Sequence, residues 1–178
     1  MPEIKITDNF IGTLSEVFYK EFCDQRDWAY VSLEQIHDKR IKNGILKFRK
    51  GFDRIYVKIP KEIIPEIEEI SKPSNKSLNN PSYVYDFLSC RVGSWRKYPP
   101  IIENKEKNDF RWIEVKTGYQ ELGRNQVQTL KKTSLKLYRF RVPYPLPEEP
   151  AYIHYDEVTS EYLSERNLVQ KDTKNTTM

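Results

Sequence analysis

Residues 110–126 read FRWIEVKTGYQELGRNQ and carry the clearest indication of fold in the chain. The run 111–116 is rich in β-favouring residues and predicts a strand, and Gln120–Lys132 predicts a helix directly after it. Alternate residues of a strand share one face, so Glu114 and Lys116 point to the same side of the predicted strand. The stretch therefore indicates a strand and helix unit with an acidic and a basic side chain together.

The rest of the chain predicts further elements around this unit. Apolar residues at helical spacing predict a helix over Ile11–Cys23, in which Thr13–Glu16 has the pattern of a capping box. A short acidic helix is predicted over Glu62–Ser71. Strands are predicted at Trp28–Val31, Ile45–Phe48, Arg54–Ile59, Tyr83–Val92 and Leu135–Val142. This order predicts an α/β fold with a mixed β-sheet flanked by helices.

Length and composition indicate one soluble domain. The chain has 178 residues, which suits a single domain over residues 1–163. The polar residues 164–178 predict a disordered tail. The sequence shows no apolar run of the roughly 18 residues that a membrane span needs, and its first residues show no secretory pattern. We therefore expect a cytoplasmic protein without a membrane partner.

Positive charge is concentrated in residues 39–61, which predict a basic hairpin inserted in the domain. Nine lysines and arginines lie between Asp38 and Lys61 against two aspartates, whereas the whole chain has a net charge of +4. Such clustering suits a polyanionic partner, with Arg49, Lys50 and Arg54 as candidate contacts to DNA phosphates. A solvated strand face is the other reading of the same run.

Several common active sites are disfavoured by the residue types present. Cys23 and Cys90 do not have the spacing of a zinc knuckle, and His37 and His154 stand beside neither cysteine. Neither histidine accompanies a recognisable nucleophile motif, which argues against a serine or cysteine hydrolase. Any catalysis is expected to use carboxylates and lysine.

Asp86 supplies the second carboxylate. If it lies on the strand next to Glu114, the two carboxylates come close together, because neighbouring strands are about 5 Å apart. Two such groups repel each other unless a cation lies between them, and Mg²⁺ accepts oxygen ligands of this kind. Lys116 beside the ion could orient an attacking water and offset charge on a phosphate.

These residues resemble the PD-(D/E)XK nucleases, in particular the VRR-NUC-like and archaeal Holliday-junction-resolvase-like branches. The matching positions span Gly12 to Leu130, and they are Asp86 in YVYDFLSC, Glu114 and Lys116 in WIEVKTG, Gln126 in ELGRNQVQTL and Glu16 in GTLSEVFYKEF. The resemblance implies a restriction-endonuclease-like core and Mg²⁺-dependent hydrolysis of phosphodiester bonds, in which Mn²⁺ can substitute. Asp86 and Glu114 would hold the metal with help from Glu16, Lys116 would activate water, and Gln126 would position it.

Two positions depart from the family pattern, and the five site residues each have a plainer reading. Tyr85 replaces a proline that commonly precedes the aspartate, and Gly123 stands where a serine often caps the helix. Glu114 with Lys116 could be a surface ion pair, and Glu16 could serve only as part of the helix cap. Asp86 could end its strand or bond a turn, and Gln126 could be a polar residue on the exposed side of its helix. Asp109, five residues before Glu114, is a reserve metal ligand at the entrance of its strand.

The sequence thus predicts a divalent-metal-dependent DNA endonuclease, structure-specific in DNA repair, recombination or restriction. Arg124, Lys131 and Lys132 follow the site and are further candidate contacts to the DNA backbone. Two alternatives stay open: a nucleic-acid-binding domain of the same fold without turnover, and an RNA-directed nuclease. Junction cleavage would favour a homodimer, although the sequence shows no dimerisation stripe.

Overall fold

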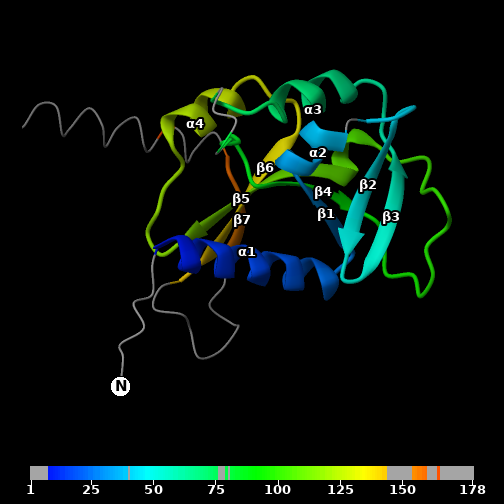
Figure 1. Cartoon of the computed structure of the whole chain (residues 1–178), viewed down its shortest axis with the longest axis horizontal. Helices are drawn as coiled ribbons and strands as arrows, with labels where there is room; N and C mark the ends of the chain where they lie inside the picture. The colour runs from blue at the N-terminus through cyan, green and yellow to red at the C-terminus, as the bar shows by residue number, and fades with distance from the viewer. Residues whose placement is uncertain are drawn as a thin grey trace, which may run out of the picture.

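The computed structural model describes residues 8–39, 41–75, 79, 81–143, 154–159 and 164, and these form a seven-stranded mixed sheet with helices on both faces (Figure 1). The helices are α1 (Asp8–Asp24), α2 (Leu33–Lys39), α3 (Ile64–Ile70), the 3-10 helix η1 (Lys107–Asp109) and α4 (Arg124–Leu130). The strands are β1 (Trp28–Ser32), β2 (Ile45–Lys50), β3 (Asp53–Lys58), β4 (Phe87–Arg91), β5 (Phe110–Thr117), β6 (Lys136–Val142) and β7 (His154–Glu157). The predicted α/β class is confirmed.

The strand order is β3-β2-β1-β4-β5-β6-β7. Only the pair β5 and β6 is parallel among the described strands, and α4 makes the crossover between them. Helix α1 lies along one face of the sheet, and α2, α3 and α4 lie on the other side (Figure 1). The strand pair that carries the predicted carboxylates, β4 and β5, is therefore central and covered on both faces.

Each face of the sheet buries its own group of apolar side chains. Under α1, Tyr19 packs with Phe87, Ile113 and Phe140. On the opposite face a larger group surrounds the buried side chain of Trp112. Because successive strand residues point to opposite faces, the odd-numbered residues of β5 meet α1 and the even-numbered ones face α4. Glu114 and Lys116 thus share the α4 side, as the sequence predicted.

Helix α1 begins earlier than the sequence indicated. It starts at Asp8, and the Ser15 hydroxyl donates a hydrogen bond to the carbonyl of Ile11, four residues back. Residues Thr13–Glu16 are therefore inside the helix, where backbone N–H groups already have helical partners and need no cap. The capping-box reading of Glu16 is wrong, and its carboxylate is available for another role.

Other boundaries also differ from the predictions. The strand predicted over Tyr83–Val92 begins only at Phe87, and the helix predicted over Gln120–Lys132 is limited to α4. Helix α2 and strand β7 were not predicted. The predicted tail falls outside the described residues except for Ser164. The basic hairpin is confirmed as β2 and β3, paired in register from Ile45 with Lys58 to Lys50 with Asp53.

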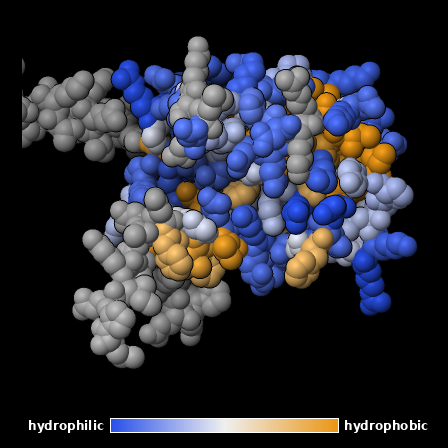
Figure 2. Space-filling model, in the orientation of Figure 1, coloured by the Kyte–Doolittle hydropathy of each residue, from blue (hydrophilic) through white to orange (hydrophobic). Residues whose placement is uncertain are grey.

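Hydrophilic residues cover much of the face seen in Figure 2. None of the described helices is long and apolar enough to cross a lipid bilayer. Both cysteines are buried and free.

The carboxylate of Glu66 ties α3 to the turn before β6. It accepts hydrogen bonds from the indole N–H of Trp112 at 3.2 Å, the backbone N–H of Ser134 at 2.8 Å and the backbone N–H of Leu135 at 3.2 Å, and also from the hydroxyls of Thr133 and Ser134. Burial alone would raise the pKa of Glu66, but these hydrogen bonds hold it below its ordinary value. The ionised carboxylate is thus a structural part of the fold.

Glu66→Ala is expected to lower the free energy of unfolding by about 3 kcal/mol, because several donors lose a charged acceptor at once. Urea unfolding at neutral pH measures the change. Glu68→Ala, an exposed glutamate of the same helix, is the matched control and should change stability by less than about 0.5 kcal/mol. Equal effects of the two substitutions would contradict the anchoring role.

Candidate active site

Asp86 lies beside Glu114, just before β4 begins. The register pairs Phe87 with Ile113, and the backbone N–H of Asp86 also donates to the carbonyl of Ile113 at 3.1 Å. Asp86 is therefore bonded to β5 just before the ladder of β4 begins, and its carboxyl group interacts directly with that of Glu114. The predicted proximity of the two carboxylates is confirmed, although Asp86 lies at the entrance of its strand and not in its middle.

The Asp86 side chain is fixed at the point where the pairing of β4 with β5 ends. Before Phe87 the chain leaves the sheet, so the N–H of Val115 in β5 has no backbone partner from β4. The Asp86 carboxylate accepts that N–H through Oδ2 at 2.7 Å. Because a side-chain oxygen replaces the missing strand partner, the carboxylate is held against β5 beside Glu114.

Glu114 and Lys116 form a close, buried pair. Glu114 Oε1 lies 2.7 Å from Lys116 Nζ, and the side chains are only 6% and 14% exposed. The reading as a surface ion pair is therefore wrong. The second oxygen, Glu114 Oε2, is buried without a hydrogen-bond partner. Such an atom is costly to leave unsatisfied, and a carboxylate oxygen of this kind is a natural ligand for a hard cation.

Burial and mutual repulsion perturb both carboxyl groups. Burial, and then the neighbouring charge of Glu114, raise the pKa of Asp86 well above its ordinary value. Burial also raises the pKa of Glu114, although the charge of Lys116 and the nearby polar groups of Gln126 and Asp86 oppose this shift. Two close carboxylates in a buried setting resist full ionisation, and a bound divalent cation would remove that penalty.

This perturbation gives a pH dependence of stability. A carboxyl group whose pKa is raised by folding binds its proton more tightly in the folded state than in the unfolded state. Without metal, Asp86 and Glu114 therefore contribute less to the free energy of unfolding as the pH rises from about 4 through their raised pKa values. Asp86→Asn should therefore become increasingly more stable than the wild type across this window. Urea unfolding of both proteins in EDTA at several pH values measures the difference. A difference that does not grow with pH would contradict the coupling of Asp86 with Glu114.

Glu16 lies within electrostatic reach of this pair. Its charge contributes to the raised pKa of Asp86. Its carboxylate is 3.9 Å from Lys20 Nζ and its side chain is 41% exposed. The neighbouring Ser15 joins α1 to the site strand through a 2.7 Å hydrogen bond to the hydroxyl of Thr117. The role of Glu16 as an assisting ligand stays a prediction.

Gln126 forms hydrogen bonds with the segment just before Asp86. Its amide Nε2 donates to the carbonyl of Val84 at 2.9 Å, and its Oε1 accepts the N–H of Gly123 at 2.9 Å. The Tyr85 hydroxyl donates to the Gln126 carbonyl at 3.0 Å. Both ends of the amide are thus engaged by backbone, which makes Gln126 a positioning residue, and its orientation of a water stays a prediction. The bond from Gly123 to Gln126 is also one half of a capping box at the start of α4, where glycine supplies no side-chain acceptor.

Two arginines beside the site were missed by the sequence reading. The parallel register places Glu114 next to Arg139 and Lys116 next to Arg141, on the same face of the sheet. Arg139 bonds Asp156 and Glu121, and Arg141 bonds Glu121 at 2.9 Å. Their spacing in β6 matches that of Glu114 and Lys116 in β5, but only the strand pairing reveals the match.

The predicted DNA contacts fall into two separated groups. Arg49 and Arg54 are exposed register partners on the hairpin, near one edge of the sheet. Arg124, Lys131 and Lys132 are exposed at the two ends of α4, on the side of β5 and β6.

Lys50 differs from the other predicted contacts because it is engaged inside the fold. Its ammonium donates to the carbonyl of Cys23 at 2.8 Å and also to that of Arg26. It therefore satisfies carbonyls at the C-terminal end of α1.

Asp109 does not join the site. It lies at the opposite end of β5 and accepts the N–H of Glu106 at 3.0 Å as part of the 3-10 turn. Glu114 is five residues along the strand, about 16 Å away at 3.3 Å per residue. The reserve role of Asp109 as a metal ligand is wrong.

Comparison with protein-family models, curated proteins and solved structures finds no significant match. Among the described residues, no group of three or more Asp, Glu, His or Cys side chains is placed to hold a metal ion. A cation between Asp86 and Glu114 would complete its shell with water and substrate oxygens, which is the usual pattern for Mg²⁺.

Proposed function

We propose that the chain is a divalent-metal-dependent nuclease of the PD-(D/E)XK type that hydrolyses phosphodiester bonds in DNA. One observation carries the proposal: a half-buried Asp86 lies beside a buried Glu114, whose Oε1 is 2.7 Å from Lys116 Nζ and whose Oε2 lacks a partner. The arrangement of a helix, the antiparallel strands β1, β4 and β5, and a helical crossover to a parallel strand supports the same family.

Each residue of the site has a separate role in the proposed reaction. Asp86 and Glu114 would hold the ion through carboxylate oxygens, and Gln126 keeps the segment before Asp86 in place. When bound, a divalent ion offsets charge on the phosphate and lowers the pKa of a coordinated water. The ammonium group of Lys116 lies beside Glu114, where it can orient the attacking water and offset negative charge that develops on the phosphate.

A binding domain without turnover is the second candidate. Lys116 Nζ and Glu114 Oε1 are 2.7 Å apart, so the two side chains neutralise each other and can form a structural ion pair without any metal. A panel of labelled branched, flapped, linear and single-stranded DNA, with matched RNA, tests both candidates in Mg²⁺ or Mn²⁺. The nuclease proposal expects metal-dependent products from DNA. Tight binding without products would favour the binding domain, and products from RNA alone would assign an RNA-directed enzyme.

The exposed face of the hairpin should contribute to the salt dependence of DNA binding. If Arg49 and Arg54 each contact a phosphate, changing both to Gln should reduce the slope of log affinity against log salt by about 1.8. Lys50 is left unchanged because it caps α1. Fluorescence anisotropy between low and moderate salt measures the slope. The matched variant changes Arg124 and Lys131 to Gln, and a larger drop there would move the DNA path to α4.

A further inference from the structure

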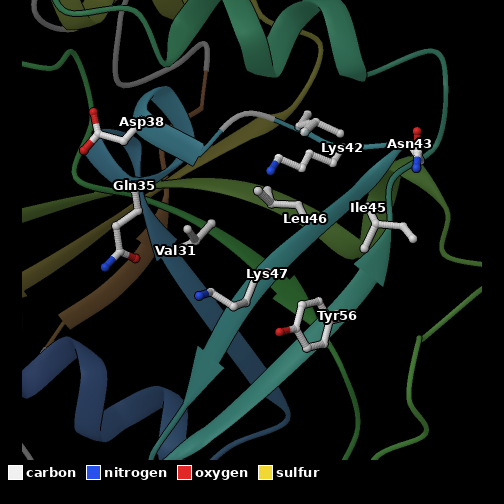
Figure 3. Close-up of a pocket in the computed structure, with 10 residues that line it drawn as sticks. Val31, Gln35, Asp38, Lys42, Asn43, Ile45, Leu46, Lys47 and Tyr56 are labelled. Carbon is white, nitrogen blue, oxygen red and sulfur yellow. The ribbon is translucent and has the colours of Figure 1, made fainter.

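A cleft opens between α2 and the hairpin, where β1 and β2 separate (Figure 3). The two strands pair at Tyr30 with Arg49, and at Leu33 the chain turns into α2, whereas β2 continues along β3. The cavity between them has a volume of about 900 Å³. This size is within the range of sites that bind small organic groups.

The lining combines apolar surface with amide groups. Val31, Ile45 and Leu46 supply apolar contacts, and the amides of Gln35 and Asn43 supply hydrogen-bond donors and acceptors. Figure 3 shows Gln35 on the α2 side of Val31 and Leu46. Asn43 lies just before the start of β2. A flat group with two apolar faces and a polar edge matches such a lining.

We propose that this cleft takes the base of an unpaired nucleotide in the DNA substrate, an inference that rests on the proposed function. Unpaired bases are bound through contacts to their faces and hydrogen bonds to their Watson–Crick edge, and both kinds of contact are present here. In a closed duplex that edge is occupied by the partner base. The cleft therefore favours flaps, bulges or branch points over blunt duplex.

Two lysines, Lys42 and Lys47, and one aspartate, Asp38, line the cavity. The lysines can contact nucleotide phosphates, and Lys47 is the register partner of Tyr56, which is 42% exposed. Arg49 and Arg54 pair two positions further along the same face of the hairpin. A basic strip thus leads into the cleft, with a tyrosine ring on which a base can stack.

The cleft is also close to the candidate active site. The N–H of Leu33, the first residue of α2, donates to the carbonyl of Asp86 at 3.4 Å. Val31 and Gln35, which line the cleft, are each two residues from Leu33. A base in the cleft would therefore belong to a nucleotide near the cleaved bond.

Binding in EDTA with Asp86→Asn as the background tests the inference without cleavage. The probes are a duplex with a three-nucleotide flap carrying 2-aminopurine and the same duplex with blunt ends. Gln35→Ala and Tyr56→Ala should each weaken flap binding by about tenfold and leave blunt-duplex binding within about twofold. Gln128→Ala, an exposed glutamine on α4, is the control and should change neither.

The 2-aminopurine fluorescence reports the base itself, which should change on binding to the parent and return toward the free value in Gln35→Ala. Equal affinity of the parent for flap and blunt duplex, equal losses on both probes, or no loss in either variant would overturn the inference. Thermal unfolding checks that the variants are folded. Cleavage by the wild type in Mg²⁺ is measured separately, so failure of the cleft and failure of the nuclease proposal give different results.

Discussion

Cleavage is expected to fall by about a thousandfold or more in Asp86→Asn and in Glu114→Gln, because each amide keeps the shape of the side chain but loses the charge that holds the ion. The two variants should differ in stability. In Asp86→Asn the amide oxygen can still accept the N–H of Val115 and a repulsion is removed, so this variant should gain stability in EDTA. Glu114→Gln leaves Lys116 without its partner and should lose stability.

Single-turnover assays with protein in excess measure the rates, and urea unfolding in EDTA measures stability. Glu121→Gln is a useful control, because it removes a nearby carboxylate that bonds Arg139 and Arg141 but lies outside the proposed metal pair. Rates of Asp86→Asn and Glu114→Gln within tenfold of the wild type would contradict the metal assignment.

Lys116→Met is expected to separate binding from chemistry. Both carboxylates remain, so DNA should bind with nearly unchanged affinity, whereas the rate should fall by about a hundredfold or more without the ammonium group. Removing one member of a buried pair also leaves Glu114 uncompensated, which should lower the free energy of unfolding by up to about 3–5 kcal/mol. Saturating Mg²⁺ and excess protein keep weakened binding from resembling slower chemistry.

Lys97→Met is the matched control, because this lysine is exposed in the segment after β4 and is not among the candidate DNA contacts. It should change stability by less than about 0.5 kcal/mol and leave the single-turnover rate unchanged. A Lys116→Met rate close to that of the control would contradict a catalytic role of Lys116 and would leave its ion pair with Glu114 as a structural feature.

Local sequence patterns were sufficient to predict the central strands of the sheet. The β-favouring runs around Asp86 and Glu114 are strong and close in sequence, so their antiparallel pairing could be predicted. The alternation rule then placed Lys116 on the same face as Glu114. The basic hairpin followed from two short strands on either side of Gly51, where φ is +57°.

Long-range pairing decided what the sequence could not show. Arg139 and Arg141 reach the site only through the register of the parallel strands β5 and β6, which no local pattern specifies. A capping pattern such as Thr13–Glu16 also occurs inside a helix, where the backbone N–H groups already have helical partners. The engagement of Lys50 by carbonyls of α1 likewise depends on tertiary contact.

The most direct test of the central claim is a divalent-metal titration of single-turnover DNA cleavage by the wild-type protein, with DNA binding followed in the same samples. We expect no cleavage in EDTA, a rate that rises with Mg²⁺ to saturation, and recovery with Mn²⁺ in place of Mg²⁺. Cleavage that is unaffected by EDTA, or DNA that is fully bound yet uncut at saturating Mg²⁺ and Mn²⁺, would contradict a metal-dependent nuclease built on Asp86 and Glu114.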